Sequence, residues 1–163
     1  MNQIDLTDIE SLVKNDLIER LYRVDYLYCS SKITSREQIE WLKSLQIKLV
    51  VDLKQSHETD FSDREEFERA GIDYIHFPIS SLAELSFSDL RELAEALISD
   101  SEPKLIYCMS SNRVGALLTL IFTYVLGHPK QRALEVGKKL GLDKEGLISQ
   151  VNSLLDQPGS LCS

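Results

Sequence analysis

Apolar and polar residues recur with two different periods along the chain. Short apolar runs that fit strands lie at residues 21–29, 48–54, 73–77 and 104–107. Elsewhere apolar residues return every three or four positions, which predicts amphipathic helices near residues 34–45, 62–70, 86–98, 130–140 and 144–155. Strands that alternate with helices predict an α/β fold, with a central, mostly parallel sheet flanked by helices.

Three further segments complete this prediction. Residues 5–20 carry a weak helical pattern and predict an N-terminal helix or arm within residues 1–20. The segment 114–126 is apolar on nearly every side, so it predicts a central buried helix. Residues 157–163 predict a loose tail. With 163 residues and no evident linker, the chain is expected to form a single domain over residues 1–163.

Several hydroxyl residues are placed to begin these helices. Thr34 with Glu37, and Ser62 with Glu65, have the spacing of a capping box. Ser86 or Ser88 is expected to begin the helix over residues 86–98.

The stretch that follows the last strand carries the candidate chemistry. Cys108 ends the apolar run, four residues separate it from Arg113, and a long apolar segment comes next. We interpret this as a strand, an anion-binding loop and a helix. Successive backbone N–H groups of the loop and the positive end of the helix would both favour an anion. A thiol there is expected to be partly thiolate, and Arg113 can bind two oxygens of an oxyanion.

A structural interpretation of the same residues stays open. Cysteine is among the most often buried residues, so Cys108 could simply end a core strand. Arg113 could be an ordinary residue of the first helical turn. The order of strand, loop and helix favours the reactive site.

Composition limits the partners and the setting. The formal net charge is −8, so the chain as a whole attracts neither nucleic acid nor an anionic membrane, and an anion site must be a local positive region. The three histidines are isolated and the cysteines show no metal spacing, so no metal or other cofactor is expected. An odd number of cysteines and no signal-peptide pattern lead us to expect a cytoplasmic protein. The oligomeric state is left open.

Other polar residues at strands are expected to be structural. Asp52 near the end of a buried strand would accept backbone N–H groups or pair with a cation. His76 alternates with Tyr74 and is expected to be packed or hydrogen-bonded. Cys29, at the end of the first strand, is also expected to be structural.

Several segments, in order, resemble a known family. The chain is similar to small bacterial phosphatases of the protein-tyrosine-phosphatase superfamily, which are dual-specificity-phosphatase-like and related to the phosphatase-like domain of beta-lactamase-hydrolase-like proteins. The resemblance runs from Tyr22 to Leu142 and rests on Tyr26-Leu27-Tyr28-Cys29-Ser30-Ser31, on residues 48–54 and 71–79, on Tyr107 to Gly115, and on residues 133–142. It implies a phosphatase-like fold with Cys108 as nucleophile and Arg113 binding phosphate, within a loop that contains Met109, Ser110, Ser111 and Asn112.

The sequence departs from the common pattern of this superfamily in four respects. The common loop has five residues between the cysteine and the arginine, whereas this chain has four, as the subgroup does. Ser111 replaces the glycine typical of the loop, which would cost about 1 kcal/mol if the position needs a positive φ. Val114 replaces the hydroxyl residue that often follows the arginine.

Where many relatives carry a general-acid aspartate this chain has Ser80 and Ser81. The nearest carboxylates are Glu84 and Asp89. Glu84 lies in the loop and is the candidate acid, and the alternative is that it is an ordinary surface residue.

Three functions fit these residues. The first is a cysteine-dependent phosphatase that acts on a phosphorylated protein or a small phosphorylated metabolite. The second is a rhodanese-like sulfurtransferase that carries a persulfide on Cys108. The third is a catalytically weak module that binds a phosphorylated partner.

Overall fold

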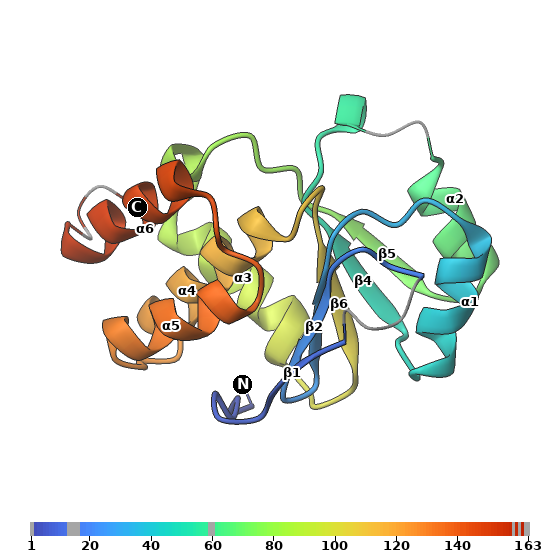
Figure 1. Cartoon of the computed structure of the whole chain (residues 1–163), viewed down its shortest axis with the longest axis horizontal. Helices are drawn as coiled ribbons and strands as arrows, with labels where there is room; N and C mark the ends of the chain where they lie inside the picture. Colours follow the sequence, from blue (N-terminus) through green and yellow to red (C-terminus); the bar gives the residue numbers. More distant parts are fainter. Residues whose placement is uncertain (1, 13–16, 59–60, 158, 160, 162–163) are drawn as a thin grey trace.

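The computed structural model describes residues 2–12, 17–58, 61–157, 159 and 161, and in this part of the chain it contains a six-stranded sheet with helices on both faces (Figure 1). The strands are β1 (Ile9–Ser11), β2 (Leu21–Val24), β3 (Leu27–Ser30), β4 (Leu49–Asp52), β5 (Asp73–His76) and β6 (Lys104–Tyr107). The helices are α1 (Arg36–Ser44), α2 (Asp63–Arg69), α3 (Phe87–Ile98), α4 (Asn112–Tyr124), α5 (Lys130–Lys139) and α6 (Glu145–Asp156), with short 3-10 turns η1 (Ser56–Glu58) and η2 (Leu82–Glu84). The predicted α/β fold is confirmed.

The sheet has the order β1-β2-β3-β6-β4-β5. β6 pairs in parallel with β3 on one side and with β4 on the other, and β4 pairs in parallel with β5. Only the hairpin strands β1, β2 and β3 pair antiparallel, so the sheet is mostly parallel as predicted. β6 lies inside the sheet, and the residue that follows it, Cys108, leaves the sheet at its carboxyl edge. This is the usual place for a site in an open α/β sheet.

Successive residues of the inner strands face two separate cores. Val50, Leu105 and Tyr107 pack with apolar residues of α1 and α2. Val51 and Ile106 pack with the cluster formed by α3, α4, α5 and α6, on the opposite face (Figure 1). Because strand side chains alternate in direction, Tyr107 and Cys108 belong to different faces. The continuous apolar runs of β4 and β6 are the pattern expected of strands covered on both faces.

The helix that follows the candidate loop is tightly packed against α5. An added Cβ at Gly137 would lie 1.9 Å from Thr119 Oγ1, and one at Gly115 would lie 2.5 Å from the Gly137 carbonyl oxygen. Thr119 Oγ1 donates to the Gly115 carbonyl at 2.8 Å. Glycine is therefore required at both positions by the close approach of the two helices, which fixes α4 and the loop at its N-terminus.

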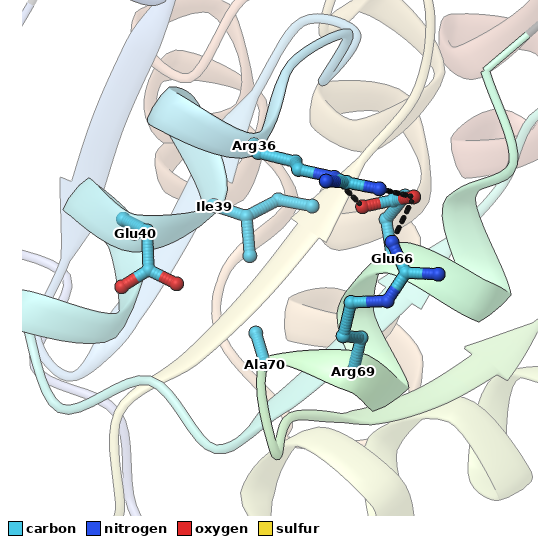
Figure 2. Close-up of a pocket in the computed structure, with 6 residues that line it drawn as sticks. All are labelled: Arg36, Ile39, Glu40, Glu66, Arg69 and Ala70. Carbon is cyan, nitrogen blue, oxygen red and sulfur yellow. Dashed lines mark hydrogen bonds and ion pairs between the residues drawn. The ribbon is translucent and has the colours of Figure 1, made fainter.

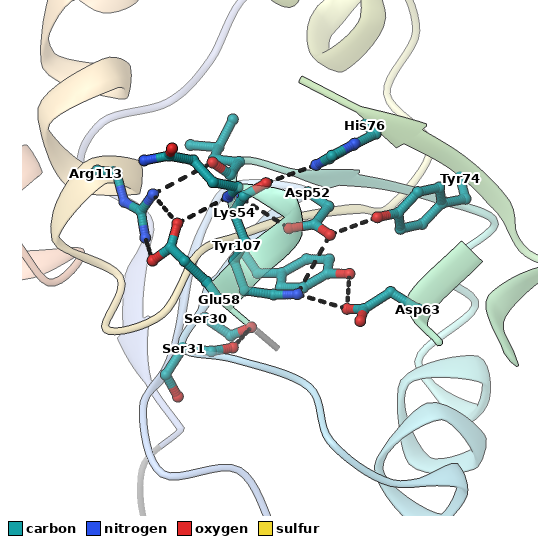
Figure 3. A network of polar contacts seen from close by, with 12 residues as sticks. Ser30, Ser31, Asp52, Lys54, Glu58, Asp63, Tyr74, His76, Tyr107 and Arg113 are labelled. Carbon is teal, nitrogen blue, oxygen red and sulfur yellow. Dashed lines mark hydrogen bonds and ion pairs between the residues drawn. The ribbon is translucent and has the colours of Figure 1, made fainter. Parts of the chain in front are cut away.

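A buried polar network lies at the end of β4, on the side of the sheet that α2 covers (Figure 3). The Lys54 ammonium, of which 1% is exposed, contacts Asp52 Oδ2 at 3.3 Å and Asp63 Oδ2 at 2.8 Å. Tyr74 donates its hydroxyl to Asp52, and Tyr107 donates to Asp63 at 2.6 Å. Burial, together with the two carboxylates, raises the pKa of the Tyr107 phenol, so it stays a neutral donor.

This network confirms the structural roles expected for two strand residues. Asp52 accepts the Lys54 backbone N–H at 2.9 Å besides pairing with its ammonium. His76 Nε2 forms a hydrogen bond with the Lys54 carbonyl oxygen at 2.6 Å. The network thus fixes the backbone where β4 leaves the sheet.

The N-terminal part differs from the prediction. Residues 9–11 form β1 instead of part of a helix, because they pair with β2 and place Glu10 beside Arg23 at 3.1 Å. A weak helical pattern is overridden by such tertiary pairing. Residues 13–16 of the expected helix lie outside the described residues.

The strand predicted over residues 21–29 is also wrong in its extent. It is a hairpin of β2 and β3 with a tight turn at Asp25, whose φ is 54°. Aspartate tolerates this left-handed conformation, which most residues avoid.

Two capping predictions are corrected. At α1 the N-cap is Ser35 instead of Thr34, and its hydroxyl accepts the Gln38 N–H at 3.2 Å. Ser62 precedes α2 as predicted, but its side chain makes no capping hydrogen bond. Ser86 begins α3 with a complete capping box to Asp89.

The last residues also differ in part from the expected tail. Leu161 is 5% exposed and belongs to the core cluster of α3 to α6. Cys162 lies outside the described residues. Among the helices that the structure describes, none is long and apolar enough to cross a membrane.

We expect Gly137→Ala to lower the free energy of unfolding by roughly 1–3 kcal/mol, because its methyl group would force α4 and α5 apart. Gly146→Ala in α6 is the matched control, since a Cβ there meets no atom within 4 Å. The control should stabilise by up to about 1 kcal/mol through helix propensity. Urea denaturation of both variants measures the difference, and equal effects would contradict the packing described.

Lys54→Met should destabilise the protein by roughly 3–5 kcal/mol, because it leaves two buried carboxylates without their cation. Lys48→Met, at an exposed position before the same strand, should change stability by less than about 0.5 kcal/mol. Urea denaturation with a fixed m-value checks both. A small loss at Lys54 would show that the network contributes little.

Candidate active site

The candidate loop joins the central strand β6 to helix α4. Cys108 follows β6, is fully buried, and donates its backbone N–H to the Ser30 carbonyl at 3.3 Å. Asn112 and Arg113 are the first residues of α4. The structure therefore brings Cys108, the loop and Arg113 together at the carboxyl edge of the sheet, in the predicted order of strand, loop and helix.

Ser111, at the loop position where a glycine is typical, adopts the left-handed backbone conformation. Its φ is 68° and its ψ is −1°, and it is the N-cap of α4. The conformation is maintained by a hydrogen bond from Ser111 Oγ to the Leu140 carbonyl at 2.7 Å, while Gly141 leaves room for the serine side chain. A left-handed residue followed by a helical one turns successive N–H groups to one side, which forms an anion-binding nest. The serine thus provides the geometry at a cost of about 1 kcal/mol.

The Arg113 side chain is held by residues outside the loop, and these residues do not bind all of its N–H donors. Nη1 and Nη2 each donate to a Glu58 carboxylate oxygen at 2.7 Å, and Nη1 also donates to the Ile79 carbonyl at 3.0 Å (Figure 3). Arginine has five N–H donors. Glu58, Ile79 and the Leu53 carbonyl, at 3.5 Å from Nη1, are bound by the two Nη1–H groups and one Nη2–H, and the Cys108 sulfur is a further partner of the guanidinium. The Nε–H and the second Nη2–H have the fork geometry that can bind two oxygens of an oxyanion.

Arg113 and Glu58 each stabilise the charged form of the other. Hydrogen bonds from Arg113 hold the pKa of the Glu58 carboxyl below its usual range, although burial acts in the opposite direction. Burial also lowers the pKa of the Arg113 guanidinium, but Glu58 and the Cys108 sulfur, which interacts with the guanidinium, outweigh burial and raise it. Arg113 is therefore a fixed cation beside the cysteine.

A cleft of about 510 Å³ opens over the loop. Four of the predicted substrate-binding or catalytic residues line it, namely Met109, Ser110, Asn112 and Arg113. Cys108 and Ser111 are buried and do not line the cleft. The rest of the cleft wall consists of Gln55, Glu58, Ser80, Lys144, Gly146 and Leu147.

The structure does not bring Glu84 into this cleft. Glu84 ends the turn η2, is exposed, and accepts a hydrogen bond from Ser80 Oγ at 2.8 Å. Ser80, at a position where many relatives carry an acid, lines the cleft in its place. The catalytic role of Glu84 remains a prediction.

Some site residues have no signal in the sequence. Glu58 lies in a polar loop that shows no motif, and Lys144 begins a helix far along the chain. Asn112 links the loop to Lys144, because its Oδ1 accepts the backbone N–H groups of Asp143 and Lys144 at 2.8 and 2.9 Å. Such contacts depend on tertiary structure and cannot be read from local spacing.

Cys29 lies beside Cys108 in the same core cluster. Burial, and secondarily its neighbour Cys108, raises the pKa of the Cys29 thiol. This keeps it neutral, in agreement with the structural role expected for it.

A second, smaller pocket of about 60 Å³ lies between α1 and α2 (Figure 2). Glu66 there accepts hydrogen bonds from Arg36 at 2.6 Å and from Arg69 at 2.9 Å. Its charges pair with each other, and its lining includes no residue of the loop 108–113. We assign it a structural role. Among the described residues, no three histidine, cysteine or acidic side chains gather where a metal ion could be held.

Comparison with solved structures identifies proteins of the same fold. The chain superimposes on the active form of Tk-PTP with a TM-score of 0.64 and 21% identity, covering 81% of this chain and 92% of that one. It matches TpbA of P. aeruginosa with a TM-score of 0.63 and 26% identity over 83% of each chain. Kinase associated phosphatase (KAP), crystallised with its catalytic site cysteine replaced by serine, gives a TM-score of 0.68 at 14% identity and covers 82% of this chain and 87% of that one.

Comparisons with protein-family models and with curated proteins find no match. The structural neighbours are protein-tyrosine-phosphatase-like phosphatases, which supports the expectation of a phosphatase. The resemblance noted in the sequence is thereby confirmed, and the chain has the protein-tyrosine-phosphatase-like fold.

Proposed function

We propose that the chain is a phosphatase that hydrolyses a phosphate monoester through a phosphocysteine on Cys108. The Cys108 thiolate attacks phosphorus, an S–P bond forms, and the bond from phosphorus to the ester oxygen breaks. The leaving oxygen takes a proton, which we assign to Glu84 after movement of its turn. Water then attacks phosphorus and gives a proton to the Glu84 carboxylate, the S–P bond breaks, and inorganic phosphate leaves with the thiolate and the Glu84 acid both regenerated.

The observation that carries this proposal is the position of the Arg113 guanidinium beside the Cys108 sulfur. Glu58 and the Ile79 carbonyl bind both Nη1–H groups and one Nη2–H, so the Nε–H and the other Nη2–H would hold the phosphoryl oxygens of a substrate at Cys108. The nest at Ser111 supplies backbone donors to the same oxygens. Donors fixed in place before the reaction stabilise the charge of the transition state without reorganisation.

The cleft is large enough for more than a phosphate group. Its volume of about 510 Å³ leaves room for part of a phosphorylated protein or for a small phosphorylated metabolite. A cysteine-to-serine variant of TpbA was crystallised in complex with pTyr. Phosphotyrosine is therefore the first substrate to test.

A second function is favoured by the position of Glu84. With this carboxylate exposed and bound to Ser80, the same loop would hold a phosphorylated partner with little turnover. The two functions share the anion site and differ in the rate of hydrolysis.

We expect Cys108→Ser to abolish release of phosphate from 4-nitrophenyl phosphate and from phosphotyrosine, because a serine hydroxyl is a far weaker nucleophile than a thiolate. Cys29→Ala is the matched control, since it removes the neighbouring buried thiol and should retain activity. The measurement is phosphate release by purified protein, with folding of each variant checked by circular dichroism. Activity that survives in Cys108→Ser would exclude the phosphocysteine.

The same preparation separates the alternatives. Thiocyanate formed from thiosulfate and cyanide would identify a sulfurtransferase instead. If neither reaction exceeds background but phosphate still raises the melting temperature, the binding module is favoured.

Glu84→Gln should lower kcat by roughly 10²-fold on an alkyl phosphate, the lower end of what general acid catalysis contributes. The loss on 4-nitrophenyl phosphate should be much smaller, because its leaving group departs without a proton. Glu92→Gln, on the exposed side of α3, should change neither rate. If Glu84→Gln lowers both rates equally or neither, the leaving group takes its proton from another source.

A further inference from the structure

Arg20 directly precedes β2, and its side chain extends to the candidate loop. Its Nη1 donates to the Ser110 carbonyl at 2.8 Å, and its Nη2 contacts Asp143 Oδ2 at 2.7 Å. Its Nε donates to the Tyr22 hydroxyl at 2.9 Å. Arg20 therefore joins the N-terminal hairpin, the loop, and the turn between α5 and α6, although it does not line the cleft itself.

The contact with the Ser110 carbonyl controls which way the next peptide unit faces. This unit leads into Ser111, whose left-handed conformation persists only if its surroundings enforce it. With the carbonyl directed to Arg20, the nest presents N–H groups to an anion. If the peptide unit turned over, a carbonyl oxygen would face the anion and repel it. A hydrogen bond from a charged guanidinium favours the first state.

The partners of Arg20 close a ring around the loop. Asp143 accepts from Arg20 and also from Asn112 Nδ2, at 3.1 Å. Asn112 Nδ2 in turn donates to Ser110 Oγ at 3.2 Å. The backbone of Arg20 is itself fixed, because its N–H donates to Ser31 Oγ and its carbonyl accepts the Ser31 N–H, both at 3.0 Å. The position of the guanidinium is thus set before any ligand arrives.

We propose that Arg20 is a positioning residue for the anion-binding loop: it holds the Ser110 carbonyl outward and thereby keeps the backbone donors of the loop directed at the bound oxyanion. The inference rests on the proposed function for the meaning of the anion. Its structural part, the orientation of the peptide unit after Ser110, does not.

The experiment measures the Kd of inorganic phosphate by calorimetry in the wild type and in three variants. Arg20→Ala should raise the Kd on the order of tenfold or more, as expected for loss of a hydrogen bond made by a charged group. Arg20→Lys should recover part of the affinity, because an ammonium can still donate to the Ser110 carbonyl. Arg23→Ala is the matched control and should leave the Kd within about twofold.

Arg23 is well matched to Arg20. It lies in β2, the strand that Arg20 precedes. The Arg23 side chain is 21% exposed, against 22% for Arg20, and it also makes ion pairs, with Asp8 and Glu10. Its hydrogen bonds and ion pairs within the described part of the chain go to Asp8, Glu10 and Asp25, and none goes to the loop. Equal weakening by Arg20→Ala and Arg23→Ala would mean that Arg20 acts only through general stability, and an unchanged Kd in Arg20→Ala would also overturn the inference.

A crystal structure of Arg20→Ala supplies a readout that does not need a ligand. We expect the peptide unit after Ser110 to turn over, or Ser111 to leave the left-handed region. If the Ser110 carbonyl still points outward, the inference is wrong whether or not phosphate binds. Failure of the wild type to bind phosphate, with the loop altered in the variant, would instead count against the proposed function alone.

Discussion

A serine in the left-handed backbone conformation determines the shape of the candidate site. Ser111 sits between the strand that delivers Cys108 and the helix that carries Arg113, with a φ of 68°. Glycine would adopt this conformation freely, whereas serine needs support. The support comes from the Leu140 carbonyl, from the space above Gly141, and from the close packing of α4 on α5. The C-terminal helices therefore support the proposed anion site, although they contribute few side chains to it.

Glu58 pairs with Arg113 but does not occupy all of its N–H donors. Glu58 accepts one N–H from each of Nη1 and Nη2, and in the proposed site the Nε–H and the other Nη2–H bind the oxyanion. The buried network of Lys54, Asp52 and Asp63 fixes the backbone from which the loop containing Glu58 departs. The buried network and the Glu58 carboxylate at the cleft thus together determine the orientation of Arg113.

Local sequence patterns predicted the elements that depend on interactions between residues close together in the sequence. The order of strands and helices followed from periodicity, and the candidate site was inferred from a cysteine at a strand end with an arginine in the first turn of the next helix. The hairpin at Asp25 was missed because its residues alternate straight through the turn. Glu58, Arg20 and Asp143 were missed because their partners are far away in the sequence, and hydrophobic spacing carries no information on such pairs. The predicted helix or arm was wrong at residues 9–11, which form a strand, because pairing with β2 outweighed a weak intrinsic helical preference.

The position of β6 has a consequence for how the chain folds. β6 lies between β3 and β4, so the N-terminal hairpin and the pair of β4 with β5 join into one sheet only through this strand. Leu27 and Leu49 both pair with Lys104, which closes long loops that cost entropy before any contact is gained. We expect insertion of β6 to be a late and slow step. Folding of the chain and assembly of the candidate loop would then be completed together, and a partly folded chain would lack the proposed anion site.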